Sequence, residues 1–300
     1  MRQWIALLAL GAISVAPTDV GAQELEPRSY ADLPKGLNVI ALAYSLSRGN
    51  IVTDPTVALQ DFRVTTHMPA LLYVRTFKLF NRLGRAQLTV PFAHLAGRAT
   101  LQGIDTSGTR TGFADARLRL GWNFIGSPAL VPKEFRSYEQ GTIVGVSLVM
   151  SVPIGQYNNT RIVNLGANRW GFKPELGLSR RFGPWYAEAY AGVWLFTDNT
   201  DYLEGKTRSQ DPIYAFQAHL AYAFPGGIWI ALNGTHVRGG ASSVDEVDGK
   251  DFQTNWRLGA TLSVPLAKQH SIKALFHSGV ATRAGADFRI VTIAYQYSWF

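Results

Sequence analysis

The stretch FADARLRLGWNF, residues 113–124, alternates apolar with polar or charged side chains at almost every step. Its six even positions are all apolar, whereas Asp115, Arg117 and Arg119 occupy odd positions. Successive side chains of a β-strand point to opposite faces, so the stretch predicts a strand with one apolar and one charged face. Its length fits the roughly 9–11 residues that a strand needs to cross a bilayer.

The same period of two runs through most of the chain. It recurs in residues 170–181, 214–224 and 252–264, again with one apolar and one polar face. Trp and Tyr stand near the ends of these stretches, as they do in the aromatic girdles of outer-membrane barrels. We therefore expect an all-β fold, a transmembrane antiparallel up-and-down β-barrel of about twelve strands, which pairs every backbone group in lipid.

The connections between the alternating stretches predict the topology. Strands are expected at residues 37–47, 61–79, 86–96, 112–124, 142–154, 169–182, 185–197, 212–224, 228–238, 251–265, 271–280 and 287–300. Tight links alternate with longer polar links at 48–60, 97–111, 155–168, 198–211 and 239–250, which is the pattern of short periplasmic turns and longer extracellular loops. Residues 126–141 depart from it: they should form a periplasmic turn but are long and contain two prolines, and the sequence predicts no role for them.

The N-terminus has the features of a secretory signal peptide. Arg2 precedes an apolar run at residues 4–15, and small residues fit a cleavage site ending at Ala22. We expect residues 1–22 to be removed and the protein to reach the bacterial outer membrane. Residues 23–36 would then be a periplasmic segment, too short for a plug domain, and residues 37–300 the barrel.

The composition argues against several other classes of protein. The chain has no cysteine, which excludes disulfides, thiolate metal sites and a cysteine nucleophile. It is 47% hydrophobic and 17% charged, unlike a disordered chain. The net charge is +8, but Lys and Arg are scattered instead of gathered into the basic face of a nucleic-acid reader. We expect no nucleic acid, cofactor or metal, and as partners outer-membrane lipid, lipopolysaccharide and a small-molecule solute.

The strongest enzymatic alternative is an outer-membrane phospholipase-like barrel, which needs Ser and His on one face. The nearest pair, His277 and Ser278, is adjacent in a predicted strand, so the two side chains point to opposite faces. The acidic run at residues 245–251 lacks the ligand spacing of a calcium loop. The sequence therefore predicts no catalytic residue and no metal site.

The inward faces of the strands are where a channel's function should lie. By alternation, the candidate lumen-lining residues are Arg63, Arg75, Asp115, Arg117, Arg119, Lys173, Glu175, Arg181, Tyr186, Glu188, Tyr190, Trp194, His219, Arg257 and Lys273. Their positive surplus fits two interpretations, namely internal ion pairs that brace the barrel or a pore that favours anions. The inward aromatic rings could stack a ring-bearing solute or fill the lumen.

Three strings resemble a known family. They are SVPIGQY at residues 151–157, NLGANRWGFKPELG at 164–177 and AYQY at 294–297. Together they resemble the outer-membrane family labelled "MetA pathway of phenol degradation", from about residue 35 to the end. The resemblance implies a barrel that passes small molecules, aromatic ones among them, and implies no catalytic residues.

The last residues resemble a second known signal. Aromatic residues alternate before Phe300, as in the signal that the bacterial barrel-assembly machinery reads, so Phe300 is expected to engage that machinery. The expected function is passive or facilitated diffusion of small, aromatic or weakly anionic molecules. The alternative is a non-transporting structural or adhesion barrel.

Overall fold

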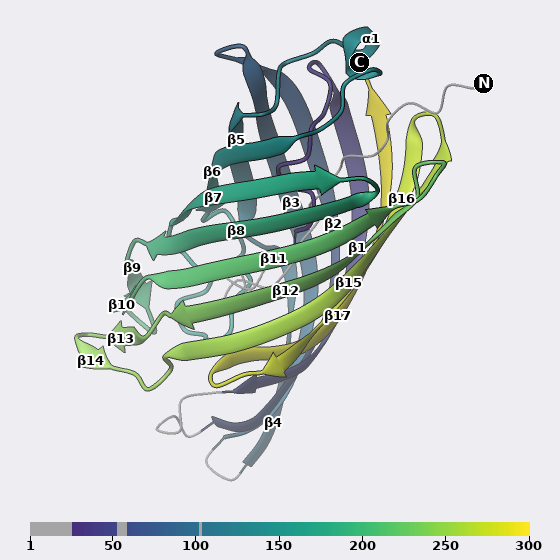
Figure 1. Ribbon diagram of the computed structural model, residues 1–300. Helices are drawn as coiled ribbons and strands as arrows, with labels where there is room; N and C mark the ends of the chain where they lie inside the picture. The colour runs from purple at the N-terminus through teal and green to yellow at the C-terminus, as the bar shows by residue number, and fades with distance from the viewer. Residues whose placement is uncertain (1–25, 53–58, 102–103) are drawn as a thin grey trace.

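The computed structural model describes residues 26–52, 59–101 and 104–300. The expected signal peptide, residues 1–22, lies outside the described residues. The chain forms a closed antiparallel barrel with twelve strands in its wall, which confirms the predicted fold (Figure 1). Among the described residues, no helix is long and apolar enough to cross a membrane.

Each expected strand has a counterpart in the wall. The wall strands are β1 (Asn38–Val52), β2 (Leu59–Leu79), β3 (Arg82–Leu101), β5 (Ala116–Ile125), β6 (Thr142–Val152), β7 (Gly171–Phe182), β8 (Trp185–Phe196), β11 (Ile213–Ala223), β12 (Trp229–Gly239), β15 (Gln253–Ala267), β16 (His270–Ala281) and β17 (Gly285–Trp299). Neighbours in this order pair antiparallel, and β1 pairs with both β2 and β17, which closes the barrel.

The two ends of the barrel differ. The turn end carries the tight connections at residues 80–81, 183–184, 224–228 and 268–269, and the loop end carries the longer ones. In Figure 1 the turn end is at the top, together with the C-terminus, and the hairpin tips at β4 and β14 lie at the opposite end. The chain therefore alternates between the two ends as most link lengths predict; the exceptions are the long connection at 126–141 at the turn end and the short link at 282–284 at the loop end.

Some expected links contain strands of their own. β4 (Ile104–Phe113) pairs with the distal part of β3, so much of the expected loop at 97–111 is a β-hairpin that extends beyond the wall. β5 resumes the same course after a two-residue break. Four short strands form a separate sheet at the loop end, namely β9 (Asn199–Tyr202), β10 (Lys206–Gln210), β13 (Ser242–Val244) and β14 (Val247–Asp248).

The long connection at residues 126–141 folds against the turn end. It contains a single helical turn, α1 (Pro132–Phe135), and Pro128 forms an isolated bridge with Arg82. The amide of Leu83 donates to the carbonyl oxygen of Ser127 over 3.0 Å. The connection is therefore attached to the rim of the barrel.

The outward face of the wall is a band of apolar side chains between two aromatic rims. Leu176, near the middle of β7, is 52% exposed. At the turn end the rings of Trp185 and Tyr222 meet edge to face at 4.9 Å, and at the loop end Trp170 stacks on Phe172 at 6.0 Å. An apolar band flanked by aromatic girdles is the outer surface of a barrel that faces lipid.

The lipid-facing band gives the first prediction. Leu176→Arg places a charge near the middle of the band and should lower the free energy of unfolding by about 2–4 kcal/mol. Val247→Arg is the matched control, because Val247 is 72% exposed in the loop-end sheet and should tolerate the charge. Urea unfolding of both variants in lipid vesicles tests this, and equal stabilities would contradict a lipid-facing β7.

Candidate functional site

The inward face of the wall holds most of the residues that alternation predicts there. Buried on it are Arg119, Lys173, Glu175, Tyr186, Glu188, Tyr190, Trp194, His219, Arg257 and Lys273. Arg117 and Arg181 also occupy inward positions, but they are half-buried near the loop end and the turn end, respectively. Asp115 is buried at the junction of β4 and β5.

Two expected lining residues face the other way. Arg63 and Arg75 of β2 are exposed on the outward face, and Nη1 of Arg75 donates to Oδ1 of Asn38 over 2.7 Å. The inward positions of β2 hold apolar side chains, among them Val64 and Met68. The alternation in β2 was predicted correctly, but the assumption that its charged residues face the lumen selected the wrong face.

The inner wall has an apolar side and a polar side. The apolar side is formed by β17, β1, β2 and the loop-end part of β3, where Val39, Met68, Leu72, Leu95, Phe288 and Ile290 belong to one buried cluster. The polar side runs from the turn-end part of β3, with Arg85 and Gln87, through β5 to β16, and it carries most of the buried charged side chains of the wall. A solute in the lumen would meet both kinds of surface.

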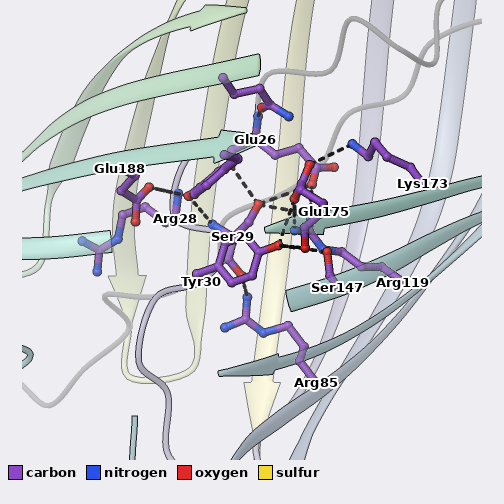
Figure 2. A network of polar contacts seen from close by, with 12 residues as sticks. Glu26, Arg28, Ser29, Tyr30, Arg85, Arg119, Ser147, Lys173, Glu175 and Glu188 are labelled. Atoms are coloured by element: carbon purple, nitrogen blue, oxygen red, sulfur yellow. Dashed lines mark hydrogen bonds and ion pairs between the residues drawn. The ribbon is translucent and has the colours of Figure 1, made fainter. Parts of the chain in front are cut away.

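Residues 26–36 lie inside the barrel, which corrects the expectation of a periplasmic segment too short to act as a plug. Every residue from Glu26 to Pro34 is buried. Ala31 and Leu33 pack into the apolar cluster, whereas the residues before them contact the polar side (Figure 2). The segment is not a folded domain, but its side chains reach both sides of the wall.

The backbone of the segment is held by side chains of the polar side. The amide of Arg28 donates to Glu188 Oε2 over 2.6 Å, and the amide of Ser29 donates to the hydroxyl of Tyr190 over 3.2 Å. From β3, Arg85 donates to the carbonyl oxygen of Ser29. These contacts fix the path of the segment, and they use its backbone amide and carbonyl groups, which do not depend on the side chains.

A buried ion-pair network joins the segment to the wall (Figure 2). The guanidinium of Arg119 lies 2.7 Å from a carboxylate oxygen of Glu26 and 2.7 Å from one of Glu175. Lys173 Nζ lies 3.1 Å from the other oxygen of Glu175. Buried charges are tolerated when each is paired, so Arg119 braces the lumen as one of the two interpretations requires.

The inward aromatic rings contact groups of the chain itself. The guanidinium of Arg28 lies 3.6 Å from the ring centroid of Tyr186. The ring of Tyr190 meets that of Tyr30 at 5.0 Å. The faces expected to stack a solute are therefore partly occupied by residues of the inserted segment.

A loop from the other end also covers the apolar side. Asp115 accepts hydrogen bonds from the amides of Gly155 at 2.9 Å and Ala167 at 2.8 Å, which folds residues 153–168 inward. Leu165 of this loop joins the apolar cluster. Two of the three strings that carry the family resemblance, residues 151–157 and 164–177, thus contribute to the loop end of the lumen.

Sequence reasoning missed several residues of the site. They are Glu26, Arg28, Ser29, Tyr30 and Asp32 of the segment, and Arg85 and Ser147 of the wall. The segment has no period, so alternation could not detect it. Inward glycines in β5, β6 and β7, at positions 121, 145 and 177, were an available signal, since a lumen wall without side chains leaves room for something else.

The structure places the residues considered for an enzyme or a metal site. His277 is buried on the inward face, and Ser278 takes the opposite position of β16. In the described part of the chain, no three His, Asp or Glu side chains form a group that could hold a metal ion.

Asp32 anchors the segment at the turn end. Its Oδ1 accepts a hydrogen bond from Ser127 Oγ, and it is 5% exposed. Burial raises the pKa of Asp32 from 3.8 to about 6, and the hydrogen bond from Ser127 opposes this shift. Asp32 therefore binds a proton more tightly in the inserted segment than in a released segment.

This shift gives a pH prediction. Since the inserted state has the higher pKa, insertion should strengthen as pH falls through 6, by about tenfold between pH 7 and pH 5. Hydrogen–deuterium exchange of residues 26–36, corrected for intrinsic rates, measures this protection. Asp32→Asn cannot titrate and should lose this part of the dependence; an identical pH response in both proteins would contradict the role of Asp32.

Arg119 gives a second prediction for the site. Arg119→Met leaves Glu26 and Glu175 without their shared partner, which should cost about 3–5 kcal/mol and release the segment before the barrel unfolds. Faster hydrogen exchange in residues 26–36, at unchanged strand protection, is the expected sign. The control is Arg117→Met, at the half-buried inward position next along β5; equal effects of the two substitutions would argue against a special role of Arg119.

Comparison with known proteins places the chain. No curated protein matches it significantly. Its fold is similar to that of the crystal structure of the COG4313 outer membrane channel from Pseudomonas putida F1, with 20% sequence identity and a TM-score of 0.79 over 92% of this chain and 100% of that one. The β domain of the Bordetella autotransporter BrkA is similar at 15% identity and a TM-score of 0.51, over 88% of this chain and 100% of that one. The family model described as "Putative MetA-pathway of phenol degradation" matches residues 47–293, and the chain belongs to that family.

Proposed function

We propose that the protein is an outer-membrane channel for small solutes that residues 26–36 hold closed. One observation carries the proposal: a short segment of the chain lies inside the barrel, buried and bound to the wall through polar contacts. A barrel that served only as a scaffold could fill its interior from its own strands, as small barrels do. A segment that is bound can be released.

The fold and the surface support the location. The apolar outward band and its aromatic rims suit lipid, and the longer connections gather at one end, as at the extracellular side of outer-membrane barrels. The similar structure from Pseudomonas putida F1 is described as an outer membrane channel. We assign the loop end to the outside and the turn end to the periplasm.

The lining favours small, aromatic or weakly anionic solutes that move by diffusion. An apolar side faces a polar side, so a ring with one polar group could contact both. Among the described residues, Lys273 Nζ and two guanidinium nitrogens of Arg257 are buried without a hydrogen-bond partner, which favours an anion. A twelve-stranded barrel lies between side-chain-filled barrels and wide porins, so the passage should be narrow.

Planar-bilayer recording tests the proposal. The full chain should show rare openings, because residues 26–36 lie inside the lumen. Glu26→Ala combined with Arg28→Ala removes an ion pair and a ring contact of the segment, and should raise the open probability by about tenfold or more, the equivalent of 1.4 kcal/mol. Lys35→Ala is the control, since Lys35 lies half-buried in the same segment at the turn end.

Two outcomes would count against the proposal. If none of the three proteins conducts, the barrel is a non-transporting structural one, which is the alternative function. If all three conduct equally, the barrel is a channel but residues 26–36 do not close it.

A further inference from the structure

The ring of Tyr30 lies in a depression of the polar side that two glycines create. Gly145 of β6 and Gly177 of β7 are paired directly across the two strands. A methyl group added at Gly145 would lie 2.6 Å from Cδ1 of Tyr30, and one added at Gly177 would overlap the ring. Any larger residue at either position would therefore close the depression.

Other groups complete a slot for one aromatic ring. The ring of Tyr190 lies at 5.0 Å with a tilt of 59°, and the guanidinium of Arg119 lies 5.3 Å from the centroid of Tyr30. Tyr30 is 2% exposed. A void of about the size of one water molecule remains beside the ring, next to Gly121. The slot thus encloses an aromatic ring and leaves room for at most a small substituent.

The far end of the slot recognises a hydroxyl group. The hydroxyl of Tyr30 lies 3.0 Å from Ser147 Oγ and 3.1 Å from Glu175 Oε1 (Figure 2). Glu175 is itself held by Arg119 and Lys173, so its position does not depend on Tyr30. Burial, with the negative charge of Glu175, raises the pKa of Tyr30 to about 12, which means that the slot holds a neutral phenol.

The ring in the slot belongs to the inserted segment, which is joined to the wall by non-covalent contacts. We propose that the slot is a binding subsite for small neutral phenols, occupied in the closed channel by the side chain of Tyr30. This rests on the proposed function in one respect, namely that residues 26–36 can be released. A phenol bound in the slot excludes Tyr30 and opposes closure, because only one ring fits between the paired glycines and Tyr190.

The chemistry of the slot predicts its selectivity. An apolar ring of the same size without a hydroxyl would lose the hydrogen bonds to Ser147 and Glu175, although Glu175 would keep its ion pairs with Arg119 and Lys173. A site built to hydrogen-bond a hydroxyl discriminates strongly against analogues that lack it. The carbon that joins the ring of Tyr30 to the backbone is para to its hydroxyl, so the para direction opens toward the lumen and para-substituted phenols fit. In the unaltered chain, the tethered Tyr30 competes at an effective concentration on the order of millimolar.

The experiment removes the competitor and supplies a free ligand. Full-length Tyr30→Ala in detergent is titrated with 4-fluorophenol, and binding is followed by fluorine NMR. We expect saturable binding at least tenfold tighter than to the unaltered chain, and at least tenfold tighter than that of 4-fluorotoluene, which has a methyl group in place of the hydroxyl. The matched control is Tyr30→Ala with Gly177→Val, which fills the slot from the strand and should abolish binding, while circular dichroism and heat-modifiable migration show that the barrel is intact.

Each outcome is decisive for the subsite. Equal binding of the phenol and the toluene, or binding that survives Gly177→Val, would overturn it, as would binding to Tyr30→Ala that is no tighter than to the unaltered chain. The result is independent of conductance. Selective binding to a barrel that never conducts would support the subsite and contradict the proposed function. Conduction without selective binding would support the proposed function and contradict the subsite.

Discussion

The contact of Arg119 with two glutamates is the interaction that joins residues 26–36 to the wall of the barrel. One glutamate, Glu26, belongs to the inserted segment, and the other, Glu175, belongs to the wall. An isolated charge in this lumen would be costly, so neither the segment nor the wall is complete without the other. The same Glu175 accepts a hydrogen bond from the hydroxyl of Tyr30, and this bond couples the ion pairs to the ring in the glycine slot. Charge pairing, segment insertion and ring burial are thus parts of one arrangement.

Because the lumen has a polar and an apolar side, a segment as short as residues 26–36 can contact the wall on both sides. Its first residues carry charges and hydrogen-bonding groups that meet the polar side, and Ala31 and Leu33 meet the apolar side. At the loop end, residues 153–168, which overlap two of the strings that carry the family resemblance, fold inward around Asp115 and add Leu165 to the apolar cluster. The wall provides the frame, and inserted pieces from both ends occupy part of its interior.

The barrel could be predicted from sequence because a lipid-facing strand must repeat every two residues. The alternation at residues 113–124 predicted which side chains of β5 face inward, and similar stretches gave most of the lining. β2 shows the limit of the rule: its period is clear, but its inward face is the apolar one, so Arg63 and Arg75 were placed on the wrong face. Residues 26–36 could not be predicted, since each contacts the wall through an individual group and no period marks them. The inward glycines are the one feature of the sequence that indicates room for a ring against the wall.

The central claim is that residues 26–36 occupy the lumen of the protein in the membrane. The chain has no cysteine, so a single Ser29→Cys can report directly on this segment. Thiol labelling by a small water-soluble maleimide in intact outer membranes should be at least about tenfold slower for Ser29→Cys than for Val247→Cys in the exposed loop-end sheet, since a buried site reacts only during local opening. Equal labelling rates at the two positions would contradict the account.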